Sequence, residues 1–280
     1  MTIAALRLHC VVCRDQNSGT PAFDGRINRC TSCGFHWTPV VDGSAGQPDL
    51  FDGHYYRNYF ARAGQWRYEA ARRLRWLSAT ARVGSLIEAG SAGGFFLEAA
   101  QKAGISASGI EPSDTCVRYA TGRLGVPAQR GCFEEMAPVT AANAVCAFHV
   151  LEHVDDPRGF LAAAGRALTP GGLLALEVPN IASAAAGREG GSWPHLQPGC
   201  HRWHFCPASL SRLLQECGFD VERLDTVSSR YYMRAHHLPS PAGMSMLIAD
   251  WGAWGSPRTV HPSLGDHIRL IARVREGSRR

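Results

Sequence analysis

The stretch that decides the fold is LIEAGSAGGFFLEAA, residues 86–100. An apolar run ends at Ala89, small residues follow from Gly90 to Gly94, and an apolar helical pattern begins at Phe95. This order predicts a strand, a tight turn and a helix. Small residues let the backbone approach a ligand, and the helix N-terminus offers unpaired N–H groups. The turn is typical of a nucleoside-cofactor site, although a strand-to-helix turn that binds nothing would look the same.

An acidic residue strengthens the cofactor interpretation. Glu111 follows the next apolar run, GI, about 20 residues after the turn. At the carboxyl end of a parallel strand, a carboxylate can accept hydrogen bonds from ribose hydroxyls. The turn and the acid together are more informative than either alone.

Apolar runs alternate with helical patterns along the rest of the chain. We expect strands at 83–89, 105–110, 143–148, 173–178, 221–227 and 267–274, and helices that begin near Gly64, Pro157 and Pro207. In the first of these helices Arg67, Arg72, Arg73 and Arg75 are expected to lie mostly away from the apolar stripe. The alternation predicts an α/β fold, a doubly wound parallel sheet covered by helices on both faces.

Composition limits the class of protein. The chain has 280 residues, 45% of them hydrophobic, which is enough for one substantial core plus a small appendage. No stretch approaches the roughly 20 apolar residues of a membrane span, and the N-terminus lacks the pattern of a signal peptide. We therefore expect a cytoplasmic protein without a membrane partner. The net charge of +5 permits acidic partners but does not indicate nucleic acid.

The sequence resembles the class I S-adenosylmethionine-dependent methyltransferases over about residues 55–275. The matching pieces follow one another in order: EAGSAGG, GIEPS, GCFE, FHVLEHVDDP, LTPGGLLALEVPN, ECGF and GDHIRLIARV. The resemblance implies a seven-stranded Rossmann-like sheet with an antiparallel last strand. One departure is Ala92, where the family more often has glycine.

The resemblance also implies a cofactor site for S-adenosylmethionine, with S-adenosylhomocysteine as product. Gly90 to Ala92 would face the amino acid part of the cofactor, Glu111 would hold the ribose, and Cys132 and Phe133 would flank the adenine. Phe148 and His149 would lie beneath the sulfonium, although simple burial of Phe133 and Phe148 is an equal alternative. The full expected set is Tyr56, Tyr59, Glu88, Gly90, Ser91, Ala92, Gly94, Glu111, Pro112, Cys132, Phe133, Phe148 and His149.

His149 is a candidate general base because it follows Phe148 at the carboxyl end of an expected strand. An imidazole with a pKa near 6.5 suits proton removal at neutral pH, whereas a locally bonded histidine is the alternative. The string His149-x-x-Glu152-His153 also matches an inverted zinc-protease motif, but the buried strand before it excludes that class. A divalent metal at these residues is a less favoured hypothesis. The simpler interpretation is that Glu152 and His153 fix the conformation of the loop.

A second histidine cluster lies in WPHLQPGCHRWHF, residues 193–205, between the fifth expected strand and the Pro207 helix. In this fold the connection overhangs the acceptor. We expect an acceptor-site or catalytic role for His201 and His204, with a loop stapled by aromatic residues as the alternative.

Two Cys-x-x-Cys pairs near the N-terminus predict a zinc ribbon. Cys10 and Cys13 are separated from Cys30 and Cys33 by sixteen residues, a spacing that suits a four-thiolate structural Zn²⁺ site. Two disulfides or a redox pair are less favoured alternatives. We expect a ribbon at 1–40, a linker and cofactor-covering segment at 41–64, and the methyltransferase domain at 65–280.

The sequence indicates the methyl acceptor less clearly than it indicates the cofactor. A small metabolite methylated on O, N or C, within a biosynthetic pathway, is favoured over RNA because the arginines of the ribbon lack closely interleaved aromatic residues. An RNA methyltransferase that uses the ribbon for recognition, or a cofactor-retaining protein without turnover, are the other hypotheses.

Overall fold

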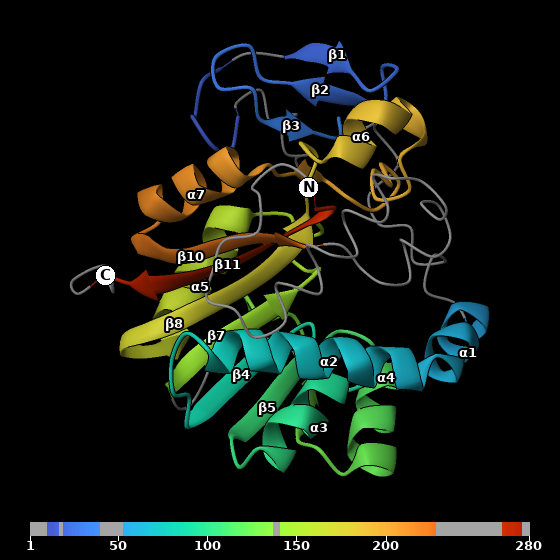
Figure 1. Ribbon diagram of the computed structural model, residues 1–280, viewed down its shortest axis with the longest axis vertical. Helices are drawn as coiled ribbons and strands as arrows, with labels where there is room; N and C mark the ends of the chain where they lie inside the picture. The colour runs from blue at the N-terminus through green and yellow to red at the C-terminus, as the bar shows by residue number, and fades with distance from the viewer. Residues whose placement is uncertain (1–9, 17–18, 40–52, 137–140, 228–264, 276–280) are drawn as a thin grey trace, which may run out of the picture.

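The computed structural model describes residues 10–16, 19–39, 53–136, 141–227 and 265–275. The expected linker at 41–52 and residues 228–264 of the irregular stretch lie outside the described residues. The main body carries a seven-stranded sheet, and a smaller four-stranded sheet lies at one end of it (Figure 1).

The large sheet has the order β10-β11-β8-β7-β4-β5-β6. All of its strands run parallel except β11, which is antiparallel to both neighbours, so the predicted sheet and its reversed last strand are confirmed. The strands are β4 (Ser85–Ala89), β5 (Ser106–Glu111), β6 (Ala128–Arg130), β7 (Ala142–Phe148), β8 (Leu168–Pro179), β10 (Phe219–Val227) and β11 (His267–Val274).

Helices cover both faces of this sheet. The α-helices of the described residues are α1 (Gly53–Ala61), α2 (Ala63–Ser78), α3 (Phe95–Lys102), α4 (Asp114–Tyr119), α5 (Pro157–Ala167), α6 (Ala184–Glu189) and α7 (Pro207–Glu216). Of these, α1 lies beyond the end of α2 and α6 lies beside the small sheet (Figure 1). Alternate residues of β7 point to opposite faces, as the period of a strand requires. Val145 and Ala147 join the core with α5 and α7, whereas Ala144 and Cys146 join the core with α2 and α3.

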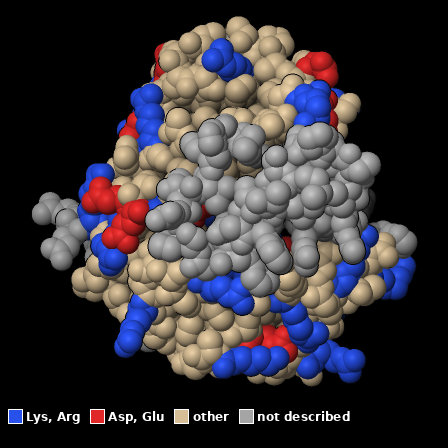
Figure 2. Space-filling model, viewed as in Figure 1, with Lys and Arg blue, Asp and Glu red and all other residues tan. Residues whose placement is uncertain are grey.

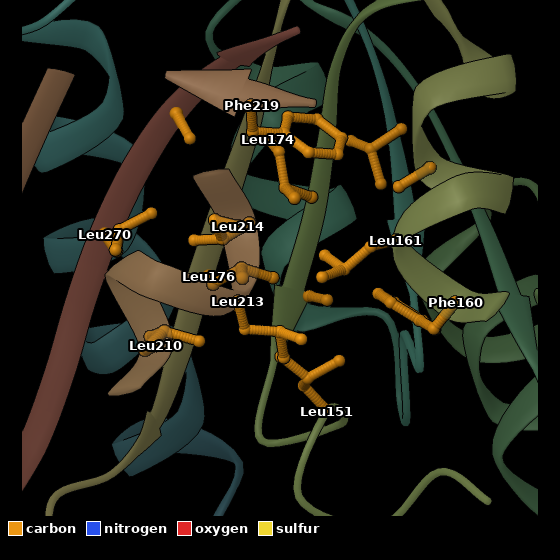
Figure 3. Close-up of a cluster of buried hydrophobic side chains, with 14 of the residues drawn as sticks. Leu151, Phe160, Leu161, Leu174, Leu176, Leu210, Leu213, Leu214, Phe219 and Leu270 are labelled. Atoms are coloured by element: carbon orange, nitrogen blue, oxygen red, sulfur yellow. The ribbon is translucent and has the colours of Figure 1, made fainter. Parts of the chain in front are cut away.

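The core beneath α5 and α7 is built mainly from leucine and phenylalanine. Figure 3 shows Leu161 of α5 and Leu213 and Leu214 of α7 directed toward Leu174 and other sheet residues. All four side chains are fully buried. Each buried leucine contributes about 1.5–3 kcal/mol relative to exposure, so this layer fixes the sheet on which the site is built.

The small sheet has the order β1-β2-β3-β9, where β1 is Thr20–Ala22, β2 is Ile27–Arg29, β3 is His36–Trp37 and β9 is Trp203–His204. β9 comes from the histidine-rich loop and pairs antiparallel with β3. The N-terminal cysteine region and this loop therefore share one sheet, which the sequence did not predict.

The structure corrects the expectation for α2. Arg72 is buried and its guanidinium lies 3.2 Å from a carboxylate oxygen of Glu69. Arg73 lies 2.6 Å from Glu177 of β8. These two arginines therefore face the sheet, where carboxylates compensate the cost of burying their charge. A second correction concerns β8, which starts at Leu168 and includes the Pro-Gly-Gly segment, with a bend at Gly171, where φ is +67°.

Candidate active site

The turn after β4 brings its backbone against the next strand. Gly90 has a φ of +67°, and its N–H donates to the carbonyl of Ile110 over 2.8 Å. A Cβ at Gly90 would lie 2.5 Å from a methyl carbon of Val150, so only glycine fits between this turn and the segment after β7. The turn and the FHVLEH segment are consequently in direct contact.

Glu111 is anchored by the same turn. One carboxylate oxygen accepts the N–H of Ala92 over 2.8 Å, and the other accepts the N–H of Ser113 over 2.9 Å. Ala92 adopts a φ of +43°, which is unusual for a residue with a side chain. Burial raises the pKa of Glu111, while these two backbone donors lower it. The carboxylate is thus fixed in place and keeps lone pairs for further donors.

Two buried polar atoms beside the turn have no hydrogen-bond partner among the described residues. They are Oε2 of Glu88 and Oγ of Ser91. Burial raises the pKa of Glu88 well above its usual range. Buried polar groups are nearly always satisfied, so these atoms fit a site completed by a polar ligand.

Helix α1 carries an aromatic cluster over the turn. A Cβ at Gly93 would lie 3.0 Å from the Phe60 ring and 3.2 Å from the Tyr59 ring. Tyr59 stacks on Trp66 with ring centroids 5.0 Å apart, and burial raises its pKa. Tyr56, on the same helix, is half-buried. The described part of the expected covering segment therefore includes a helix, α1, that lies beside the turn.

The remaining predicted cofactor residues differ in exposure. Cys132 is exposed, whereas Phe133 is buried with its ring 5.2 Å from that of Phe160. Phe148 is also buried, and the guanidinium carbon of Arg73 lies 4.6 Å from its ring centroid. Both phenylalanines contribute to the core in this structure.

His149, at the end of β7, lies between two buried carboxylates. Its Nδ1 is 3.1 Å from Oε1 of Glu152, and its Nε2 is 3.0 Å from Oε1 of Glu177. Burial lowers the pKa of His149, but the two carboxylates outweigh it and raise the pKa to about 9. The sequence alone predicts a pKa near 6.5, because neither carboxylate can be assigned to the histidine from it.

Glu177 is the centre of this charge cluster. Besides His149 it pairs with Arg73, and with Arg269 of β11. Burial raises the pKa of Glu177, but the arginines and His149 bring it well below its usual range. Glu177 and Arg269 were not among the site residues predicted from the sequence. A single acid inside the apolar strand LALEVPN was the available signal, since charged residues in buried strands are rare unless paired.

His201 and His204, the two candidate residues of the histidine-rich loop, are both buried. Nδ1 of His201 is 2.8 Å from the carbonyl oxygen of His195. Nε2 of His204 is 2.9 Å from the hydroxyl of Thr38. Burial lowers the pKa of His201 to about 4 and that of His204 to about 3, so both rings are neutral at neutral pH.

The four N-terminal cysteines converge on one point. Their Sγ atoms lie within 4.8 Å of one another, and the Cys10–Cys33 and Cys13–Cys30 pairs are 3.6 Å apart. The two pairs form matching turns. The N–H of Arg14 donates to the carbonyl of Cys10, and the N–H of Gly34 donates to that of Cys30, both with positive φ at the donor. None of these four cysteines forms a disulfide, and four thiols are a donor set that suits Zn²⁺.

Residues 53–224 match the family described as "Methyltransferase domain", which covers more than half of the chain. The chain belongs to this methyltransferase family. The matched range includes the turn after β4, Glu111, the FHVLEH segment and the Pro-Gly-Gly segment of β8. The protein is an S-adenosylmethionine-dependent methyltransferase, as the family and the relatives below agree.

Curated relatives of the methyltransferase include ubiquinone biosynthesis O-methyltransferases. The enzyme of Thiobacillus denitrificans is 26% identical over 192 residues, which cover 63% of this chain and 83% of that enzyme. The enzyme of Methylobacterium nodulans is 33% identical over 162 residues, which cover 52% of this chain and 63% of that enzyme. The chain thus spans less than two thirds of the second relative.

Solved structures share the fold of the methyltransferase. A protein of Thermotoga maritima described as a possible histamine N-methyltransferase aligns with a TM-score of 0.56 at 18% identity, covering 80% of this chain and 97% of its own. A methyltransferase of Archaeoglobus fulgidus aligns with a TM-score of 0.54 at 19% identity, covering 77% and 99%. Among the described helices of the methyltransferase, none is long and apolar enough to cross a membrane.

Proposed function

We propose that this methyltransferase transfers the methyl group of S-adenosylmethionine to an O, N or C atom of a small metabolite and releases S-adenosylhomocysteine. The main support is the contact between the cofactor turn and the segment that follows His149. Gly90 of the cofactor turn packs on Val150, one residue after His149, so the cofactor turn and a buried charge cluster share the carboxyl edge of the sheet. Ligands of open α/β sheets bind at this edge.

The cofactor is proposed to lie along the turn after β4. Glu111 would hold the ribose, and Gly90, Ser91, Ala92 and Gly94 would face the amino acid part. The unpartnered oxygen of Glu88 offers an acceptor for a positively charged group nearby. Pro112, Cys132, Phe133 and Phe148 would surround the adenine and sulfonium, and Tyr56 and Tyr59 of α1 would cover the site.

When bound, S-adenosylmethionine supplies an electrophilic methyl group, and the protein aligns the acceptor with it. We assign proton removal from the acceptor to the neutral form of His149. Glu152 accepts the Nδ1–H, and once the ring has released its second proton to solvent, Nε2 carries the lone pair for the acceptor and its contact with Glu177 opens. Glu177 keeps Arg73 and Arg269 when that contact opens, so its charge stays compensated. A base with an orienting carboxylate behind it is a common catalytic arrangement.

We assign the loop that carries His201 and His204 to the acceptor side of the site. His204 joins the loop to Thr38, and the N–H groups of Arg202 and Trp203 donate to the carbonyl of Glu152. These contacts hold the loop against the FHVLEH segment. His201 and His204 are neutral and buried, so their proposed contribution is to shape the acceptor site.

The cysteine region is proposed to be a structural zinc ribbon, residues 1–40, followed by the covering segment 41–64 and the catalytic domain 65–280. Four thiolates saturate a tetrahedral Zn²⁺ ion, which leaves no position for chemistry. The guanidinium of Arg158 in α5 donates to the carbonyls of Val11 and Val12 over 2.7 and 2.8 Å. The ribbon would thereby brace the catalytic domain. Free thiols suit the reducing cytoplasm, where we place the protein.

RNA is the less favoured acceptor. Three of the four arginines of α2 form internal ion pairs, Arg67 with Glu98, Arg72 with Glu69 and Arg73 with Glu177. On the face in Figure 2, the basic side chains of the described residues lie in separate groups, several of them beside acidic ones. Phosphate backbones are bound by continuous basic surfaces, and the described residues on this face do not form one.

Transfer of a radiolabelled methyl group tests the proposal. The full chain would be incubated with labelled S-adenosylmethionine and either a panel of phenols, amines and acidic C–H compounds or total RNA. We expect label in at least one small acceptor and none above background in RNA. Labelled RNA with an unlabelled small-molecule panel would overturn the assignment of the acceptor.

A further inference from the structure

The FHVLEHV motif is divided between two clusters of metal-binding residue types. His149 lies with Glu177 and His267, whereas His153 lies with Cys200 and His201 of the histidine-rich loop. In each cluster the candidate ligand atoms lie within 4.8 Å of one another. Neither set can be read from the sequence, because each combines residues from distant segments.

The first cluster is poorly suited to a cation. Glu177 already pairs with Arg73 and Arg269. A metal ion placed there would meet two guanidinium charges at close range, and it would have to compete with both for the one carboxylate. The two guanidinium groups already compensate the negative charge of Glu177.

The second cluster presents its ligands in the form that a metal ion requires. Nδ1 of His153 is 3.0 Å from the carbonyl oxygen of Cys200, and Nδ1 of His201 is 2.8 Å from that of His195. A carbonyl accepts only, so each Nδ1 carries the hydrogen and each Nε2 presents a lone pair. Metal-bound histidines usually donate their other ring N–H to a carbonyl or carboxylate in this way.

The loop that supplies two of these residues is fixed against the third. The carbonyl of Glu152 accepts the N–H groups of Arg202 and Trp203 over 2.8 and 3.2 Å. The imidazole rings of His153 and His201 lie edge to face with centroids 4.7 Å apart. These backbone hydrogen bonds therefore hold the loop that carries His201 beside His153.

A buried negative charge lies beside this cluster. Glu152 is fully buried, and its Oε1 is 3.1 Å from His149, while its Oε2 has no hydrogen-bond partner among the described residues. A buried carboxylate with an unsatisfied oxygen favours a cation close by.

We propose that His153, Cys200 and His201 bind one divalent transition-metal ion, with Zn²⁺ the best fit to two imidazoles and a thiolate. Ligand bonds of about 2.0–2.3 Å separate the ligands of a tetrahedral ion by roughly 3.3–3.8 Å, so small side-chain shifts close the site. Binding releases the thiol proton of Cys200 to solvent. Three protein ligands leave the fourth position for a water molecule, in contrast to the four-thiolate site of the N-terminal region.

Metal counting on the full chain tests this site independently of methyl transfer. The protein would be saturated with Zn²⁺, passed over a desalting column and measured by elemental analysis. Cys200→Ala and His153→Gln should each hold one equivalent less than the wild type. Cys132→Ala, which removes an exposed cysteine outside both clusters, should hold the wild-type amount. Cys30→Ser should lose only the metal ion bound by the four N-terminal cysteines, so this variant distinguishes that site from the one proposed here.

Substitution with Co²⁺ identifies the ligands. One thiolate and two imidazoles give visible bands distinct from those of a four-thiolate site, and these bands should vanish in Cys200→Ala and His153→Gln while circular dichroism stays unchanged. Equal metal content in the wild type and both variants would overturn the proposal. So would a wild type whose cobalt spectrum contains the four-thiolate bands alone. A Cys200→Ala protein that fails to fold leaves His153→Gln to decide.

Discussion

The hydroxyl of Thr38 lies 2.9 Å from Nε2 of His204 and 2.6 Å from the backbone carbonyl oxygen of His201. The hydroxyl has one hydrogen, which it donates to the carbonyl, so the histidine Nε2–H must donate to the hydroxyl. A residue next to the cysteine region thus sets the tautomer of a histidine in the proposed acceptor loop. Because β3 and β9 also pair, the two segments form one structural unit.

Replacement of Thr38 by valine should impair turnover while cofactor binding stays intact. The variant leaves the His201 carbonyl and the His204 N–H without their partner, at a cost of about 1–3 kcal/mol in the free energy of unfolding. We expect kcat/KM for the acceptor to fall and the Kd for S-adenosylhomocysteine to change less than about twofold. Thr121→Val removes an exposed hydroxyl and is the matched control. Equal kinetics in both variants would remove Thr38 from the acceptor site.

The rate of methyl transfer should increase with pH up to about 9. His149 must be neutral to accept a proton, and its two carboxylate neighbours raise its pKa to about 9. His149→Gln should lower kcat by about 10²–10⁴ and abolish the inflection near pH 9. A steady-state pH profile of kcat/KM measures both effects. A wild-type profile that is flat from pH 6 to 9 would exclude His149 as the base.

The free energy of unfolding should depend on the neutral state of His204. Burial lowers the folded pKa to about 3, below the unfolded value of 6.5, so the unfolded chain binds the proton first. This stability is fully present above pH 6.5 and is lost, at up to ~1.4 kcal/mol per pH unit, as the pH falls toward 3. Urea denaturation between pH 7.5 and 4.5 should show a shallower fall for His204→Gln than for wild type. Parallel curves would mean that His204 is protonated in the folded protein.

An alanine at Gly109 should disturb the cofactor turn. Its Cβ would lie 2.4 Å from Oγ of Ser91, which the turn cannot move away without shifting its backbone. We expect weaker binding of S-adenosylhomocysteine and a lower melting temperature. Gly122→Ala meets nothing within 4 Å and is the matched control. Wild-type affinity in Gly109→Ala would show that the turn tolerates displacement.

Much of the fold was predictable because its elements carry strong local patterns. The last strand was predicted at 267–274 and is found at His267–Val274, since the segment HIRLIARV, rich in β-branched and other apolar residues, follows a Gly-Asp pair. The helix at Pro207 was equally clear from its apolar spacing and its proline start. β6 and β9 were missed because they are three and two residues long and exist only through pairing with distant strands.

The candidate site was less predictable than the fold. Glu111 could be assigned from its place after a strand, and the structure shows it bonded to the cofactor turn. The charge state of His149 could not be assigned, because it depends on Glu177, which is 28 residues away in sequence. Sequence spacing likewise groups His149 with His153, yet their rings enter different clusters. Convergence of distant segments, and not local pattern, decides the chemistry of these residues.

The central claim is that S-adenosylmethionine binds between the turn after β4 and Glu111. Isothermal titration calorimetry of S-adenosylhomocysteine with wild type, Glu111→Gln and Glu135→Ala tests it most directly, since Glu135 is exposed and lies outside the site. We expect one binding event per chain, weakened about 10–100-fold in Glu111→Gln through loss of a charged acceptor, and unchanged in Glu135→Ala. Absence of binding to wild type, or equal affinity in Glu111→Gln, would contradict it.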